Sequence, residues 1–95
     1  MDCYYVYALQ SLKNGRIYIG LSTNPERRLN NHNIGETKST RPWRPWKLIF
    51  QKKIGDRATA RLAEKKLKSG FYKELLKEGK LQIIDQFLSS GVAQR

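Results

Sequence analysis

Apolar and polar side chains alternate along the first quarter of the chain in a way that predicts two paired β-strands. Residues 3–9 are rich in aromatic and β-branched side chains and carry no charge, which predicts a buried strand. Residues 16–21 alternate strictly, with Tyr18 on the face opposite the apolar one. Asn14-Gly15, between the two segments, is a strong hairpin-turn signal. We therefore expect an antiparallel hairpin with Tyr7 and Tyr18 close to opposite each other, and with neighbouring rings if they share a face.

The next segment carries the signals of a helix, a loop and a third strand. Asn24-Pro25 predicts a helix start, because asparagine is a favoured N-cap and proline suits the first helical position. The helix is expected to run to about Asn33 and to be followed by a polar, basic loop over residues 35–45. Residues 46–53 predict the third strand, whose alternation places three apolar side chains on one face: Trp46, Leu48 and Phe50.

Helical spacing dominates the second half of the chain. Asp56 is expected to cap a helix that ends at Gly70, a shorter helix is expected over residues 71–78, and a last, weaker one over 81–88. Because strands come early and helices late, the predicted fold class is α+β, a small three-stranded antiparallel sheet flanked by helices. The expected organisation is a single domain over residues 1–88 and a flexible C-terminal tail over residues 89–95.

The composition and net charge of the chain indicate which class of molecule it binds. The chain has 95 residues, 39% of them hydrophobic, which is enough for one small domain with a modest core. Its 19 lysine and arginine residues against 8 acidic ones give a net charge of +11, which favours a nucleic-acid partner. Cys3, the one cysteine, is expected in the core and excludes an internal disulfide and a cysteine-based zinc site. Without a transmembrane stretch or an apparent signal peptide, we expect a cytoplasmic protein with no membrane partner.

Glu64 is the most informative single position in the helical half. It falls on the apolar stripe that Ala60, Ala63 and Leu67 form at helical spacing. A carboxylate on a buried face is costly unless it is paired or binds a metal. The alternative is that Glu64 lies at the edge of the stripe and pairs with Lys68 four residues on.

Four further residues form a second candidate site. Arg28 and His32 are four residues apart and so share one face of the first helix. Each has an ordinary interpretation, because an isolated arginine or histidine on a helix is usually solvated or satisfied. Tyr7 and Tyr18 have one too, because aromatic residues fit strands. Taken together, the four residues favour a polar cluster over the open face of the sheet.

The loop after the first helix has a composition that suits phosphate contacts. Residues 37–44 combine three cations, three hydroxyls and an indole. The alternative is a solvated connector. The tyrosines and Trp43 would add aromatic surface on which bases or sugars could stack.

The chain resembles the GIY-YIG nuclease family. Tyr5-Val6-Tyr7 stands at the first motif and Tyr18-Ile19-Gly20 at the second. Arg28 follows Tyr18 at the spacing of the family's essential arginine, and Glu64 matches its metal-binding glutamate on a later helix. The resemblance covers residues 3 to about 76 and is strongest to small stand-alone bacterial and phage members, which resemble the nuclease domains of excision-repair and intron homing enzymes.

The resemblance implies a metal-dependent endonuclease that hydrolyses phosphodiester bonds of DNA, in repair or recombination. Glu64 would hold Mg²⁺ or Mn²⁺, and Arg28 would stabilise charge on the phosphoryl oxygens. The attacking water would be positioned or deprotonated by one of three residues among which the sequence does not choose: Tyr7, Tyr18 or His32. DNA is the expected partner; branched, nicked or single-stranded DNA, and RNA, all stay open as substrates, and a protein partner could supply targeting. The residues expected to contact nucleic acid are Arg27, Lys38, Arg41, Trp43, Arg44 and Lys68.

Two departures from the family pattern keep other functions open. Tyr5 stands where the first motif has its glycine. No asparagine follows Asn33, so the role of the family's downstream asparagine is empty or falls to Gln82 or Gln86. The second hypothesis is therefore a catalytically weak nucleic-acid-binding module on the same scaffold. The third is a protein-interaction adaptor, disfavoured by the charge of +11, that would use the C-terminal helix with Trp43 and Trp46.

Overall fold

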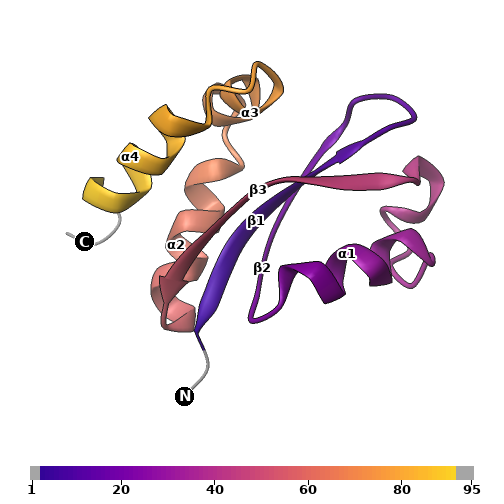
Figure 1. Ribbon diagram of the computed structural model, residues 1–95, viewed down its shortest axis with the longest axis horizontal. Helices are drawn as coiled ribbons and strands as arrows, with labels where there is room; N and C mark the ends of the chain where they lie inside the picture. The colour runs from indigo at the N-terminus through magenta and orange to yellow at the C-terminus, as the bar shows by residue number, and fades with distance from the viewer. Residues whose placement is uncertain (1–2, 92–95) are drawn as a thin grey trace.

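A three-stranded antiparallel sheet forms the centre of the computed structural model, which describes residues 3–91 and the side chains of residues 3–88 (Figure 1). The strand order is β2-β1-β3. The strands are β1 (Tyr4–Ser11), β2 (Ile17–Ser22) and β3 (Trp46–Gly55). The helices are α1 (Pro25–Asn33), the 3-10 helix η1 (Arg41–Trp43), α2 (Arg57–Leu67), α3 (Gly70–Lys77) and α4 (Leu81–Gly91). The predicted α+β class and its small antiparallel sheet are confirmed.

The hairpin of β1 and β2 sets which side chains face one another. Tyr7 pairs with Gly20, and Tyr18 pairs with Leu9. Tyr7 and Tyr18 are therefore diagonal neighbours on one face rather than opposite each other, with ring centroids 6.4 Å apart. The rings are close, as expected, but the glycine of the second motif stands directly across from Tyr7.

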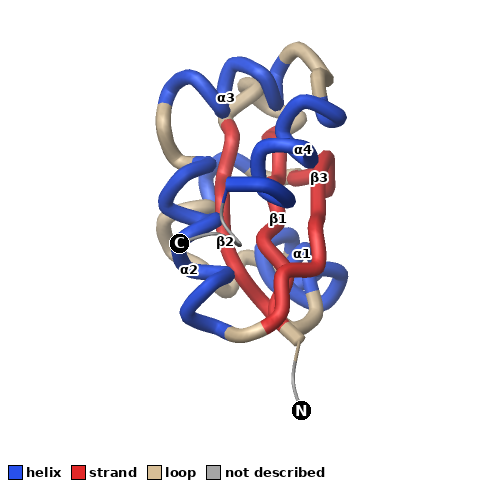
Figure 2. The backbone as a smooth tube through the Cα atoms, turned by 90° about the vertical axis from the view of Figure 1, so that its left-hand side faces the viewer, coloured by secondary structure: helices blue, strands red, loops and turns tan. Residues whose placement is uncertain are grey.

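Alternate side chains of β1 enter two separate cores on the two faces of the sheet. Val6 and Ala8 belong to the larger core, together with residues of α2, α3 and α4 such as Leu67, Leu76 and Ile84. Figure 2 shows α2 and α4 in front of the sheet and α1 behind it. The smaller core lies on the α1 face and consists of Tyr7, Leu9 and Trp46, with Tyr18, Leu29, Trp43 and Leu48 packed against it.

The expectation that Trp46, Leu48 and Phe50 share one face of β3 is wrong. The register between β1 and β3 shifts at Ile49, because Ala8 pairs with Phe50 while the next residue of β1 pairs with Leu48. Such a bulge reverses the facing of the side chains beyond it. Trp46 and Leu48 therefore pack in the smaller core, and Phe50 packs in the larger one.

The N-cap residues in the sequence correctly predicted where α1 and α2 begin. The side chain of Asn24 accepts a hydrogen bond from the backbone N–H of Arg27 at 3.1 Å, and Asp56 caps α2 in the same way through Thr59 at 3.1 Å. The second helix ends at Leu67, before Gly70, which instead begins α3.

The two ends of the chain differ from expectation. Cys3 is exposed just before β1, so its predicted place in the core is wrong. At the other end, α4 reaches Gly91, three residues into the segment expected as a tail, and residues 92–95 lie outside the described residues. Within residues 3–91, no helix is long and apolar enough to cross a lipid bilayer.

Candidate active site

Five polar or aromatic residues from four elements converge near the hairpin, and we refer to them as the polar cluster. β1 supplies Tyr7, β2 supplies Tyr18, α1 supplies Arg28 and His32, and α2 supplies Glu64. The ring of Tyr18 lies 6.4 Å from that of Tyr7 and 4.7 Å from that of His32, centroid to centroid. Arg28 hydrogen bonds to the side chain of Tyr7, and the charge of Glu64 also acts on that phenol. The residues expected to share a site are thus neighbours.

Tyr7 is the centre of these contacts. Its side chain is almost fully buried, with 1% of the residue exposed. Burial raises the pKa of the Tyr7 phenol above its ordinary value, because the phenolate would lose solvation, while the hydrogen bond from Arg28 opposes that rise. Tyr7 is therefore a neutral phenol at neutral pH, with the side chain of Arg28 within reach of its hydroxyl.

Gly20 has a structural role in the site that was not predicted from the sequence: it makes room for the Tyr7 side chain. A β-carbon at this position would lie 2.7 Å from the Tyr7 hydroxyl oxygen and 2.8 Å from the adjacent ring carbon. Real side chains do not approach so closely, so only glycine lets the phenol lie across the strand. The cross-strand pairing of positions 7 and 20 was the missing signal, and it depends on the register of the hairpin.

His32 is fully buried and fixed by a loop residue. Its Nδ1 lies 2.8 Å from the hydroxyl oxygen of Thr40, whose own hydroxyl donates to the carbonyl oxygen of Thr37 at 3.3 Å. Nδ1 is then the donor, and Nε2 is left as a bare acceptor with no partner among the described residues. Burial, followed by the nearby charge of Arg28, lowers the pKa of His32. The imidazole is therefore neutral at neutral pH.

Glu64 shows features of both interpretations that the sequence allowed, a carboxylate on the buried face and an ion pair with Lys68. Its side chain is mostly buried, with 13% exposed, yet it lies 3.7 Å from the Nε of Arg61 and 3.6 Å from the Nζ of Lys68. Both partners are more than half exposed, so these long ion pairs contribute little to stability. Residues 3–88 contain no group of three or more acidic, histidine or cysteine side chains arranged for a metal. A lone carboxylate still fits Mg²⁺, which is commonly held by one or two carboxylates together with waters and substrate phosphates.

The residues expected to contact nucleic acid lie outside the polar cluster. Arg27 and Lys38 are exposed, Lys68 pairs with Glu64, and Arg41 and Arg44 line a surface pocket. Trp43 is half-buried against the smaller core, and the guanidinium of Arg16 covers its ring at 4.5 Å.

The structure also bears on Trp46, named in the adaptor hypothesis, and on the two glutamines of α4. Trp46 is only 4% exposed and donates its Nε1 hydrogen to the carbonyl oxygen of Thr40, so the adaptor hypothesis loses one of its contact residues. Gln82 and Gln86 lie on α4, which packs on the face of the sheet opposite α1. Since α2, which carries Glu64, packs on that face too, a role for either glutamine in place of the family's asparagine stays a prediction.

Comparison with known proteins agrees with the geometry. A family model described as the GIY-YIG catalytic domain matches residues 3–77, a range that contains the whole polar cluster. Two UPF0213 proteins of Streptococcus agalactiae, from serotypes V and III, are each 34% identical to this chain over 83 residues. The match covers 86% of this chain and 88% of each relative. The chain therefore belongs to the GIY-YIG family, whose catalytic domains are nucleases, and is similar to its small stand-alone members.

Proposed function

We propose that the protein is a divalent-metal-dependent endonuclease that hydrolyses phosphodiester bonds of DNA. The observation that carries the proposal is that the Arg28 side chain hydrogen bonds to the Tyr7 phenol and that the charge of Glu64 is close enough to act on the same group. A permanently charged guanidinium, a phenol and a carboxylate provide what phosphodiester hydrolysis requires: charge stabilisation, orientation of a nucleophile and a ligand for a metal ion.

Glu64 would hold the cation. The carboxylate is close enough to Tyr7 for its charge to act on the phenol, and its exposed cationic partners can move away at small cost. When bound, Mg²⁺ or Mn²⁺ supplies Lewis-acid polarisation of the phosphate and stabilises the leaving oxygen.

Arg28 would stabilise the negative charge that develops on the phosphoryl oxygens. An arginine guanidinium is a cation whose planar fork matches the geometry of phosphate. Tyr7 acts here as a positioning residue, because its buried hydroxyl anchors the guanidinium. Removing either partner should therefore reduce cleavage, with the larger loss for Arg28.

Solvent access favours Tyr18 as the group that contacts the attacking water. Tyr18 is half-buried, whereas Tyr7 is 1% exposed and the Nε2 atom of His32 is buried. A general base must lie within hydrogen-bond reach of the proton that it accepts. In this scheme neutral His32 packs against the Tyr18 ring, and the hydrogen bond to Thr40 fixes the orientation of the imidazole.

The finer biological assignments are also proposals. A role in repair or recombination follows from the family resemblance. A branched, nicked or single-stranded DNA substrate, a cytoplasmic location and targeting by a protein partner are proposed with it. RNA remains an alternative substrate, because a small basic domain reads mainly the phosphate backbone.

A second candidate is a nucleic-acid-binding module that cleaves weakly. It is favoured by the lack of any asparagine after Asn33 in the sequence, because the family's downstream asparagine then has no matching residue. This alternative predicts DNA binding that survives both chelation and loss of Glu64, without products.

Cleavage of labelled branched and linear DNA with Mg²⁺, with Mn²⁺ and with chelator separates the two candidates. Glu64→Gln and Arg28→Ala should each lower cleavage by about a hundredfold or more, the range for removing a group that stabilises developing charge. Glu78→Gln and Arg57→Ala are matched controls, because both side chains are exposed and neither residue belongs to the polar cluster or to the residues expected to contact nucleic acid. Metal-dependent products that disappear only in the first pair establish the nuclease. Tight binding without products on any DNA would leave the binding module.

A further inference from the structure

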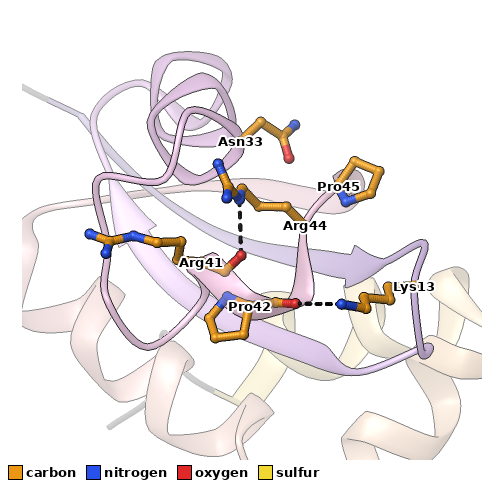
Figure 3. A pocket seen from close by; sticks show the side chains of 6 residues that line it. All are labelled: Lys13, Asn33, Arg41, Pro42, Arg44 and Pro45. Atoms are coloured by element: carbon orange, nitrogen blue, oxygen red, sulfur yellow. Dashed lines mark hydrogen bonds between the residues drawn. The ribbon is translucent and has the colours of Figure 1, made fainter.

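A basic pocket lies where the hairpin turn meets the loop before β3, at the C-terminal end of α1 (Figure 3). Its volume is about 570 Å³, and no acidic residue lines it. Among the residues whose side chains the structure describes, no carboxylate forms an ion pair with any of its three cations. The lining residues are Lys13, Asn33, Arg41, Pro42, Arg44 and Pro45.

The walls of the basic pocket are held together by hydrogen bonds between distant segments. The hydroxyl of Ser11 donates to the carbonyl oxygen of Trp43 at 2.6 Å, and the backbone N–H of Leu12 donates to that of Pro45 at 2.8 Å. Lys13 Nζ reaches the carbonyl oxygen of Pro42 at 3.3 Å, as Figure 3 shows. The loop is thus fastened to the turn of the hairpin, so that a ligand would meet cations that are already in position.

The two arginines are oriented by backbone carbonyls and by a glycine. Arg41 donates through Nε to the carbonyl oxygen of Gly35 at 2.8 Å, and Arg44 donates through Nε to that of Arg41 at 2.9 Å. A β-carbon at Gly35 would lie 2.8 Å from the Nη1 atom of Arg44, and φ there is +89°. Glycine therefore makes room for the guanidinium. Because the backbone bonds use Nε, the terminal amino groups of both forks are available for an anion such as phosphate.

We infer that the basic pocket binds one internal phosphate of the nucleic-acid strand, at a position away from the bond that is cut. Thr40, whose hydroxyl contacts His32, directly precedes Arg41, so the pocket and the polar cluster are built on the same loop and the same end of α1. A strand held in both places would be fixed in register along α1. The inference rests on the proposed function for the identity of its ligand, but it does not require that the strand be cut.

Binding of unphosphorylated DNA oligonucleotides, measured in chelator over a range of salt concentrations, tests the inference without cleavage. The pocket variant Arg41→Gln/Arg44→Gln should bind about tenfold more weakly, the scale of losing one charged hydrogen-bonded contact. The slope of log affinity against log salt should fall in magnitude by about one unit, because one phosphate contact is lost. The control Lys66→Gln/Lys77→Gln removes the same charge from exposed positions on α2 and α3 and should change both quantities less.

Two further variants separate charge from geometry and from folding. Arg44→Lys keeps the charge but loses the planar fork, so its affinity should lie between those of the wild type and the double variant. Lys13→Gln removes a cation whose one side-chain hydrogen bond is exposed and 3.3 Å long, while the bonds of Ser11 and Leu12 still fasten the turn to the loop, so it should weaken binding with little effect on folding. It therefore tests the pocket even if thermal unfolding shows that the double arginine variant is destabilised.

The results distinguish three causes of an affinity loss: diffuse charge, a terminal phosphate and an internal phosphate. Equal losses in the pocket and control variants would show that only diffuse charge matters and would overturn the inference. A loss confined to oligonucleotides with a terminal phosphate would show that the pocket reads a strand end, which also overturns it. A specific loss with unphosphorylated DNA supports it. If wild-type protein then binds but never cleaves with Mg²⁺ or Mn²⁺, the proposed nuclease fails while the phosphate pocket stands.

Discussion

The hydroxyl oxygen of Tyr7 lies 2.7 Å from the point where a β-carbon on Gly20 would stand. The two residues are a cross-strand pair at the centre of the hairpin, and the same hydroxyl receives the side chain of Arg28 from α1. Gly20, in the second motif, is thus needed to make room for Tyr7, in the first motif. Because Arg28 acts on the same hydroxyl, a shift of the Tyr7 ring would also change the surroundings of the arginine.

Gly20→Ala should therefore displace the Tyr7 ring. Because Tyr7 is buried, the ring has no solvent to move into, and overpacking of this kind costs about 1–3 kcal/mol. We expect that loss in the free energy of unfolding, measured by urea titration, together with reduced cleavage as Arg28 loses its anchor.

Two comparisons make this prediction specific. Gly70→Ala, at the first position of α3, meets no atom within 4 Å and should not destabilise the protein. In a Tyr7→Ala background the ring is absent, so Gly20→Ala should cost much less there than in the wild type. A cost that is the same in both backgrounds would show that the ring is not what the new methyl group meets.

The sequence predicted features that are encoded locally. Asn24-Pro25 and Asp56 identified their helices because a cap acts on residues within one turn. The closeness of Tyr18 and His32 was also predicted, because helix and strand periods indicate which face of each element a side chain occupies.

Features that depend on the pairing of distant segments were not predicted. The bulge at Ile49 moved Phe50 to the other core, and no local pattern around it marks the extra residue. The offset between Tyr7 and Tyr18, and with it the role of Gly20, depends on the hairpin register. Thr40 became the partner of His32 only because a loop folds back over α1, which its polar composition does not reveal.

Thr40→Val should expose how His32 is held. The change keeps the shape of the side chain but removes the hydroxyl, leaving the buried Nδ1–H without an acceptor at a cost of about 1–3 kcal/mol. In the wild type, ¹⁵N spectra of the imidazole at neutral pH should show a protonated Nδ1 and an unprotonated Nε2. A protonated Nε2 in the wild type would contradict the assignment of Thr40 as the acceptor. Thr40→Ser, which keeps the hydroxyl, should retain the wild-type tautomer.

Stability should fall as the pH is lowered through the ordinary range of histidine titration. The pKa of His32 is lowered in the folded protein, so between that value and about 6.5 the unfolded chain binds more protons. The free energy of unfolding therefore decreases as pH falls through this window, by at most about 1.4 kcal/mol per pH unit, and this contribution becomes constant below it. Above pH 6.5 the contribution is fully present.

His32→Gln provides the control for this pH dependence. His32 is the single histidine of the chain, so the variant lacks the group that ordinarily titrates near pH 6.5. Urea unfolding between pH 7.5 and 5 should give a steeper loss of stability for the wild type than for the variant. Parallel curves would mean that His32 titrates alike in the folded and unfolded chain, contrary to its complete burial.

Two adjacent isoleucines on α4 test whether this helix belongs to the domain, since the family match ends at residue 77. Ile84 is 0% exposed and packs in the larger core, whereas Ile83 is 41% exposed. Ile84→Ala should cost about 2–5 kcal/mol of unfolding free energy, and Ile83→Ala much less, because only the first leaves a cavity. Both substitutions remove the same atoms from neighbouring helical positions, so helix propensity cancels in the comparison. Equal small costs in urea titrations would show that α4 adds little to the fold, and that Val6 and Ala8 are covered without it.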